Sequence, residues 1–219
     1  MSKYKLQIGN VKIGDKFPPV FFAEIGTFFN QDIKKAKLLI NKIVKIRNKS
    51  STPIILKTEV LHNPDICLRG SASEIYFSKK GKKKVENLRE LIERKVISLE
   101  KYKKIFDFCK NLKIPTVASV YDEEGAQFAS ENVDALKIAS PNIIHHPLLE
   151  YASKLNVPII IDTGRAELFE IKEAVKILKK NKVRDVIIEH SPDGHPSHPI
   201  DHNLKTIQTF QKVSKLVSD

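Results

Sequence analysis

Cysteine is scarce in this sequence, with only Cys67 and Cys109 among 219 residues. Neither residue belongs to a Cys-x-x-Cys pair or to another spacing typical of a metal site, so the cysteines argue against a structural zinc centre. Two isolated cysteines in a chain of this length are typical of free thiols in a reducing compartment. We therefore expect no disulfide and a cytoplasmic location.

Long apolar runs are also missing. No stretch approaches the roughly 18 consecutive apolar residues needed to span a bilayer. The N-terminal segment M-S-K-Y-K-L-Q-I lacks the apolar core of a signal peptide. We therefore expect no membrane partner.

Positive charge, by contrast, is abundant, with a net charge of +12. Most lysines are spread over amphipathic segments such as residues 33–45 and 175–183, where they occupy the polar face of a helix. The one dense run, from Ser78 to Lys84, has no interleaved aromatic residues and fits no nucleic-acid motif. We expect that run to be a solvated loop and expect no nucleic-acid partner. The positive field favours anionic metabolites instead.

Short apolar runs alternate with helical periodicity along the chain. A hairpin is predicted around the Gly-Asn turn at residues 9–10. Six strand-like runs follow, and each is succeeded by a helical segment. After the second run, a polar, irregular stretch at about 61–84 comes before the helical segment. This pattern predicts a parallel sheet covered by helices, in one domain over 1–219 with the hairpin in 1–19 and βα units in 20–219. The runs cover residues 20–26, 53–60, 115–122, 135–140, 158–164 and 186–191.

The choice between a doubly wound sheet and a barrel depends on the strand ends. The first strand is followed by E-I-G-T-F-F-N, which has a single glycine and so no dinucleotide fingerprint. Nearly every strand ends in a polar residue, as in barrels, where catalytic groups sit at the carboxyl ends of many strands. We therefore expect an α/β fold of the (β/α) TIM-barrel type. Because six units are found, strands seven and eight are expected to be missing, and the open edges predict a homodimer or a complementing chain.

Lys57 and Lys137 each follow aliphatic residues in a predicted strand. Two such lysines in one barrel mouth would form a receptor for a phosphate or a carboxylate. The alternative is that each lysine extends to solvent from the sheet. Further donors at strand ends and in the adjoining turns are Ser119, Ser140, Thr163 and Arg165.

Glu24 and a histidine-rich loop complete the candidates. A carboxylate at a barrel mouth acts as a general base or holds a sugar hydroxyl, while the alternative for Glu24 is a salt bridge to one of the lysines. His190 ends the sixth strand and is a candidate active-site donor. The spacing of the later histidines matches no standard zinc motif, which leaves weak metal candidates at His195, His198 and His202.

These residues together make the chain resemble the sialic acid synthase family, which includes the pseudaminic and legionaminic acid synthases. The likeness runs from the hairpin, which looks like that family's barrel cap, to about residue 210. Its motifs, in order, are I-G-N-V-K-I-G at Ile8, A-E-I-G at Ala23, N-Q-D at Asn30, L-K at Leu56, S-L-E-K-Y-K-K-I-F-D-F-C-K at Ser98, A-S-V-Y-D at Ala118, L-K-I-A-S at Leu136, P-L-L-E-Y at Pro147, I-D-T-G-R-A at Ile161 and E-H-S at Glu189.

The resemblance implies a transferase of carbohydrate biosynthesis. Family members condense phosphoenolpyruvate with an N-acyl amino sugar to form a nine-carbon sugar acid, using manganese or magnesium to polarise the sugar aldehyde. It assigns catalytic roles to Glu24 and Lys137 and places Tyr121 and Asn142 on the sugar side. The expected phosphoenolpyruvate contacts are Lys57, Ser119, Lys137, Ser140, Thr163, Arg165 and His190.

The chain departs from the family pattern at several positions. Phe28-Phe29 stand where the family has Asn-His, Asn142 where it has an acidic residue, and Asp162 where it has a serine. The family's metal-binding histidines and its antifreeze-like C-terminal domain have no counterpart here. Two hypotheses follow: an enzyme of this family, or a degenerate or truncated barrel that binds an anion or sugar, or a partner subunit, without catalysis.

Overall fold

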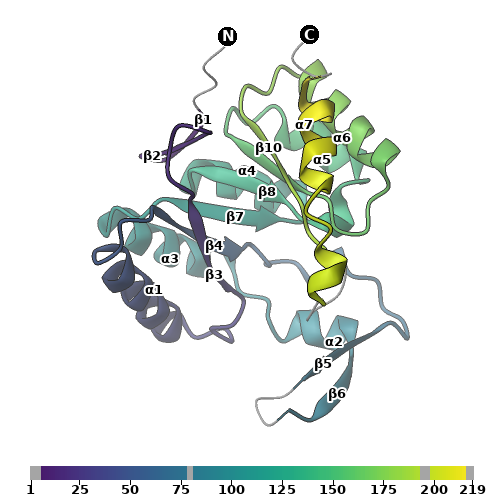
Figure 1. Cartoon of the computed structure of the whole chain (residues 1–219). Coiled ribbons are helices and arrows are strands. Elements are labelled where there is room, and N and C mark those ends of the chain that lie inside the picture. The colour runs from purple at the N-terminus through teal and green to yellow at the C-terminus, as the bar shows by residue number, and fades with distance from the viewer. Residues whose placement is uncertain (1–5, 78–80, 193–197, 216–219) are drawn as a thin grey trace.

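Six parallel strands form the centre of the computed structural model, which describes residues 6–77, 81–192 and 198–215. The strands pair in chain order, and each βα unit therefore lies beside the next (Figure 1). This arrangement confirms the predicted alternation of strands and helices. In order across the sheet they are β3 (Phe21–Gly26), β4 (Ile54–Glu59), β7 (Thr116–Val120), β8 (Ala135–Ile138), β9 (Ile159–Asp162) and β10 (Val186–Glu189).

Helices cover one face of this sheet, where α1 contacts α3, α3 contacts α4, α4 contacts α5 and α5 contacts α6, while α2 lies against β6 (Lys83–Asn87) and η1. The first shows why they form: Asp32 caps its start, and Ala36, Ile40 and Val44 repeat every fourth residue on its buried face. The helices are α1 (Ile33–Arg47), α2 (Leu88–Glu93), α3 (Leu99–Asn111), α4 (Glu123–Asn132), α5 (His146–Ala152), α6 (Leu168–Lys180) and α7 (Thr206–Lys215), with 3₁₀ turns η1 (Pro64–Ile66), η2 (Ser140–Asn142) and η3 (Pro199–His202).

The opposite face of the sheet packs against the N-terminal hairpin of β1 (Leu6–Ile8) and β2 (Val11–Ile13). Alternate strand residues therefore divide into two cores: one set packs with the helices and the other with the hairpin. A doubly wound sheet would carry helices on both faces, so this division identifies the barrel type. The inner core consists of Leu6, Ile8, Ile55, Val117, Ala135 and Ile160.

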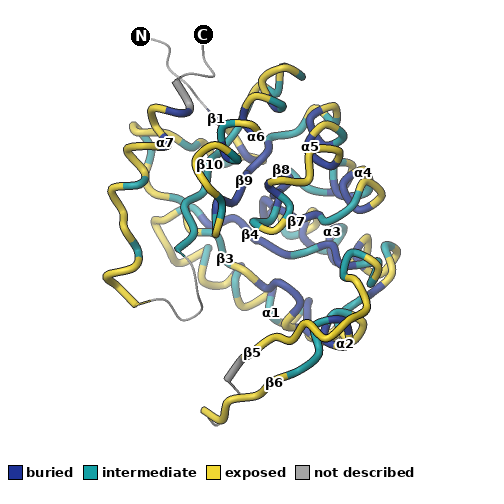
Figure 2. The backbone as a smooth tube through the Cα atoms, turned by 90° about the vertical axis from the view of Figure 1, so that its right-hand side faces the viewer, coloured by how far each residue is buried: buried dark blue, intermediate teal, exposed yellow. Residues whose placement is uncertain are grey.

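The strands are arranged as a curled half-barrel (Figure 2). In the described part of the chain, β3 and β10 are the edges of the sheet. The half-barrel confirms the predicted fold type, whereas the expectation that two strands are missing stays a prediction. No helix among the described residues is long and apolar enough to cross a membrane.

Residues 61–84 were expected to be irregular, and this expectation was wrong in part. Strands β5 (Ser73–Phe77) and β6 (Lys83–Asn87) form an antiparallel ribbon that projects from the body of the molecule (Figure 1). Lys83 and Lys84 of the predicted loop are exposed residues of β6, and residues 78–80 lie outside the described ranges. Strand pairing along the ribbon, with Ile75 opposite Val85, overrides the polar composition.

Both cysteines are free, as predicted. Cys67 is half-buried, and Cys109, on the inner face of α3, is buried in the core. Burial raises the pKa of the Cys109 thiol to about 12. The thiol is therefore protonated at neutral pH and is suited to packing rather than to chemistry.

Candidate active site

A row of polar side chains lies on the inner face of the half-barrel, two residues beyond the apolar inner core on each strand. Because strand residues alternate between faces, Lys57 shares the face of Ile55, and Lys137 shares that of Ala135. Pairing of parallel strands in register brings the row together at their carboxyl ends. Its members are Glu24, Lys57, Ser119, Lys137, Asp162 and Glu189.

Lys57 and Glu24 form an ion pair, with 2.5 Å between the Lys57 Nζ and the Glu24 Oε1. The Lys57 side chain is buried, whereas Glu24 is partly open to solvent. A bulge in β3 after Glu24 shifts the register, and the Thr58 hydroxyl donates a 2.9 Å hydrogen bond to the Gly26 carbonyl there. The salt bridge that the sequence offered as the alternative for Glu24 is therefore present.

Lys137 is held between two carboxylates contributed by the next two strands. Its Nζ lies 2.8 Å from Asp162 Oδ2 and 2.7 Å from Glu189 Oε2. The side chains of Lys137 and Asp162 are 9% and 12% exposed, and that of Glu189 is 42% exposed. Asp162 also accepts a hydrogen bond from the Gly164 backbone N–H at 3.1 Å. The predicted lysine thus sits in the barrel mouth, already paired with negative charge.

The pairing shifts both buried groups toward their charged forms. Burial acts to lower the pKa of Lys137, but the hydrogen bonds and charges of Asp162 and Glu189 outweigh it and raise this pKa above 10.5. Burial likewise acts to raise the pKa of Asp162, yet Lys137 and the hydrogen bonds from Gly164 and Ser191 lower it below 3.8. At neutral pH the lysine and this carboxylate are both ionised.

Glu59 and Glu189 face the same mouth and were not among the predicted site residues. Glu59 stands two residues beyond Lys57 and accepts a hydrogen bond from the hydroxyl of Tyr121. Burial and this carboxylate raise the pKa of Tyr121 well above 10.0. The strand period of two was the signal that could have found both glutamates. With Glu59 added, the row holds two lysines and four carboxylates, Glu24, Glu59, Asp162 and Glu189, which gives a formal charge of −2.

Comparison with known proteins places this arrangement in a family. The model of the NeuB family matches residues 57–218, well over half of the chain. The chain belongs to the NeuB family. The matched residues include Lys57, Ser119, Lys137, Asp162 and Glu189.

Individual known proteins are similar to this chain over most of its length. The chain is 29% identical over 95% of its length to an uncharacterized protein of Methanocaldococcus jannaschii, covering 56% of that protein. It is 26% identical over 90% of its length to the N,N'-diacetyllegionaminic acid synthase of Campylobacter jejuni, covering 58% of it. The chain thus spans about half the length of these curated relatives.

A solved NeuB-family structure has the same fold. The N-acetylneuraminic acid synthetase of Leptospira borgpetersenii, determined in complex with citrate, superposes with a TM-score of 0.79 at 25% identity. The match covers 97% of this chain and 67% of the synthetase. The predicted family resemblance is confirmed.

Ser140, Tyr121 and Asn142 also lie at this end of the NeuB-family half-barrel. A Cβ built on Gly164 would lie 3.2 Å from that of Ser140 and 3.4 Å from that of Ser191, so the turn after Asp162 sits between two serines. The Asn142 side-chain amide donates a 3.1 Å hydrogen bond to the Tyr121 carbonyl. Asn142 therefore holds the loop that follows β7.

His190, Thr163 and Arg165 lie apart from the inward row. The His190 ring contacts Phe210 of α7, and its Nε2 lies 2.7 Å from the His202 carbonyl oxygen. Alternation explains this: Glu189 faces inward, so His190 faces the helices. The Thr163 hydroxyl donates to the Glu189 carbonyl at 2.9 Å. Both residues, with Arg165, line a separate hollow of about 320 Å³ between the ends of β9 and β10 and helix α7.

The histidines suggested as metal ligands do not form a site among the residues that the structure describes. No three His, Cys, Asp or Glu side chains there are grouped to hold a metal ion. His198 accepts a hydrogen bond from the Ile200 backbone N–H through its ring at the start of η3. His195 lies outside the described residues. The described residues do not fit the divalent metal that the resemblance implies.

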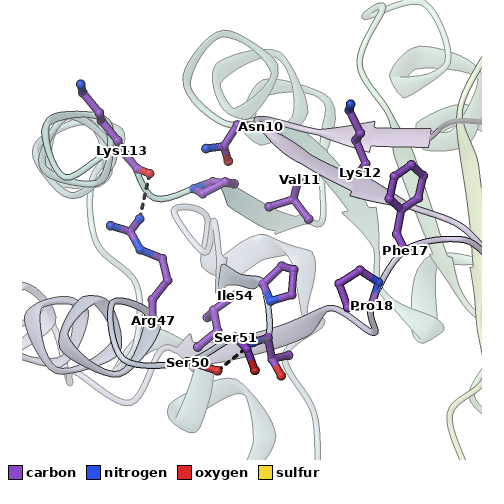
Figure 3. Close-up of a pocket in the computed structure, with 13 residues that line it drawn as sticks. Asn10, Val11, Lys12, Phe17, Pro18, Arg47, Ser50, Ser51, Ile54 and Lys113 are labelled. Atoms are coloured by element: carbon purple, nitrogen blue, oxygen red, sulfur yellow. Dashed lines mark hydrogen bonds between the residues drawn. The ribbon is translucent and has the colours of Figure 1, made fainter.

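A second hollow, of about 680 Å³, lies at the opposite, amino end of the strands. Its cations are Lys12, Arg47 and Lys113, but Arg47 donates to the Lys113 and Leu112 carbonyls that end α3. The ammonium ends of Lys12 and Lys113 point away from the other lining residues (Figure 3). Barrel enzymes place their catalytic residues at the carboxyl ends of the strands, so this hollow is not a candidate active site.

Proposed function

We propose that the inward row binds phosphoenolpyruvate and an amino sugar, and that their condensation forms a sialic-type nonulosonic acid. Membership of the NeuB family supports the reaction class, since relatives carry the names of legionaminic, pseudaminic and N-acetylneuraminate synthases. A related synthetase has been determined with citrate, an anion rich in carboxylates. The chain would act as a transferase in carbohydrate biosynthesis.

One observation carries the proposal. Two buried lysines, Lys57 and Lys137, face the inner side of the sheet near the carboxyl ends of their strands. Ser119, on the strand between them, is in register with Lys137. Barrel enzymes bind substrate at this end of the strands. A lysine ammonium binds phosphate and carboxylate as a point charge, and a hydroxyl donates to either.

The roles proposed for individual residues follow from their places in the mouth. Lys57, Lys137, Ser119 and Ser140 would hold the phosphate and carboxylate of phosphoenolpyruvate. Glu24, which is the more exposed partner of its ion pair, would take a proton from the attacking water or hold the sugar. Tyr121 and Asn142 would line the sugar side. The other suggested anion contacts, Thr163, Arg165 and His190, would act from the neighbouring hollow.

A non-catalytic binding barrel is the second candidate, and a specific observation favours it. Both lysines are already paired with carboxylates, and the formal charge of −2 in the row repels an anion. A barrel of this kind could hold a sugar through its carboxylates without activating phosphoenolpyruvate.

The anion site is tested by thermal unfolding with phosphoenolpyruvate. We expect the ligand to raise the Tm of the wild-type chain. At a ligand concentration of 100 Kd, binding should stabilise the folded state by about 3 kcal/mol. Lys137→Ala and the milder Ser119→Ala should reduce the shift, each compared with its own ligand-free Tm. Lys176→Ala breaks a lysine–glutamate pair on the surface of α6 and serves as the matched control. An equal shift in all variants would remove Lys137 from the site.

Phosphate release separates the enzyme from the binder. Phosphoenolpyruvate, N-acetylmannosamine and manganese are supplied together, and inorganic phosphate is measured. We expect release that depends on the sugar, and a loss of about 100-fold or more in Glu24→Gln, the size typical of a missing general base. Phosphoenolpyruvate binding without any release would favour the non-catalytic barrel.

A further inference from the structure

The two carboxylates on Lys137 are held very differently. Asp162 is buried, with 12% of its side chain exposed, and it accepts hydrogen bonds from the Gly164 backbone and from the Ser191 side chain. Glu189 is 42% exposed, and its carboxylate pairs with Lys137. Asp162 is therefore a fixed part of the site, whereas Glu189 lies on its solvent side and is free to turn away.

We infer that Glu189 is an internal competitor for the anion site, because its carboxylate occupies the face of the Lys137 ammonium that an anionic ligand must contact. This inference rests on the proposed function, since it concerns how the same site receives phosphoenolpyruvate. An incoming phosphate or carboxylate replaces Glu189, while Asp162 stays in place and keeps Lys137 directed into the mouth.

The geometry supports an exchange of one anion for another. The Glu189 Oε2 lies 2.7 Å from the Lys137 Nζ, the distance of a charge-assisted hydrogen bond that a ligand oxygen would make. Only 9% of the lysine side chain is exposed, so a bulky anion has little free surface to use beside Glu189. A ligand that left Glu189 in place would also bring like charges together.

Displacement also has a modest energetic cost. An ion pair with one exposed partner contributes little, because solvent screens it and side-chain entropy opposes it. Removal of Asp162 would instead leave a buried ammonium partly unpaired, which is strongly unfavourable. Glu189 is therefore the carboxylate that leaves Lys137, and its long side chain can turn into solvent.

The test is the affinity for phosphoenolpyruvate, measured by calorimetry on the whole chain. Glu189→Gln keeps the shape of the side chain and removes its charge. If Glu189 occupies Lys137 about nine-tenths of the time, its removal should tighten binding about tenfold. Asp162→Asn should give no such gain, because Asp162 positions Lys137. Glu173→Gln breaks a 2.6 Å pair with Lys176 on α6 and should leave the affinity unchanged.

The outcomes separate this inference from the proposed function. If wild type and Glu189→Gln bind with equal affinity while Lys137→Ala does not bind, Glu189 is not a competitor, but the anion site at Lys137 is supported. An equal gain in Asp162→Asn also overturns it, since the two carboxylates would then be equivalent. Absence of binding in every variant contradicts the proposed function itself. If Glu189→Gln fails to fold, Glu189→Asp, whose carboxylate reaches less far, should show the same gain.

Discussion

Lys137 shows how a single buried charge governs its surroundings. An ammonium group in a strand is costly to bury unless it is paired, and here two carboxylates from neighbouring strands supply the pairing. Asp162, the more buried of the two carboxylates, fixes the position of the lysine before any ligand arrives.

The ionisation of this group predicts how stability varies with pH. The pKa of Asp162 is lowered below 3.8, so its contribution is present above that pH and is lost as the pH falls through the folded-state pKa. The pKa of Lys137 is raised above 10.5, so its contribution is complete below that pH and is lost as the pH rises further. Between these limits the contribution of both groups to the free energy of unfolding is constant.

Acid unfolding of Asp162→Asn checks this expectation. Below about pH 4 we expect the free energy of unfolding to fall less steeply in the variant than in wild type, because the variant has one carboxylate fewer to protonate. Urea titrations at a series of pH values measure it. Glu150→Gln, at an exposed position on α5, is the control and should follow wild type. Parallel curves for Asp162→Asn and wild type would contradict the linkage.

At the scale of elements, the hairpin of β1 and β2 closes the inner face of the sheet. Its apolar residues Leu6 and Ile8 complete the inner core. The turn at Gly9 has φ of +56°, and a Cβ built there would lie 3.0 Å from Pro115 Cβ and 3.1 Å from Asp134 Oδ1. The turn therefore needs glycine both for its backbone conformation and for its close approach to the sheet.

Gly9→Ala should accordingly be costly. The left-handed backbone costs about 1–2 kcal/mol for a residue with a Cβ, and the contact with Pro115 adds about 1–3 kcal/mol of overpacking. The matched control is Gly81→Ala, since Gly81 has φ of +72° and nothing within 4 Å of its Cβ position. Urea unfolding should show the larger loss for Gly9→Ala. Equal losses would mean that backbone strain alone accounts for the effect.

At the scale of the whole molecule, the described sheet is an arc with two open edges. Strands β3 and β10 each have one neighbour among the described strands, and Phe21 of β3 is exposed. Unpaired strand edges present backbone donors and acceptors to other chains. The same edges flank the row of charged residues, so a chain added there would also border the mouth.

We therefore predict self-association or capture of a complementing chain. Light scattering at micromolar concentration should give a mass above the 24.9 kDa of one chain. Substitution of exposed Phe21 by lysine, a residue that protects natural sheet edges, should shift the mass toward that of the monomer. Phe28→Lys, at an exposed aromatic outside the strands, is the control and should not. A monomer at all concentrations would contradict the prediction.

The sequence by itself determined the order of the elements and the face of each strand residue. A strand alternates with a period of two, so Ile55 and Lys57 must share a face wherever the strand lies. Aliphatic runs separated by amphipathic helices likewise impose a parallel sheet, because only such a sheet buries both faces of each strand. The parallel sheet and the shared face of Lys57, Ser119 and Lys137 with the apolar residues two places before them were therefore predictable from local pattern, whereas the choice of a barrel rested on the polar strand ends.

The tertiary structure decided which groups meet. Lys137 contacts Asp162 and Glu189 only because β8, β9 and β10 pair in a given register. Lys137 and Glu189 are 52 residues apart in the sequence. The ribbon at 73–87 and the orientation of His190 toward α7 likewise depend on distant partners. Propensity and alternation act within one element, whereas register, pairing and the neutralisation of buried charge act between elements, and local sequence does not encode them.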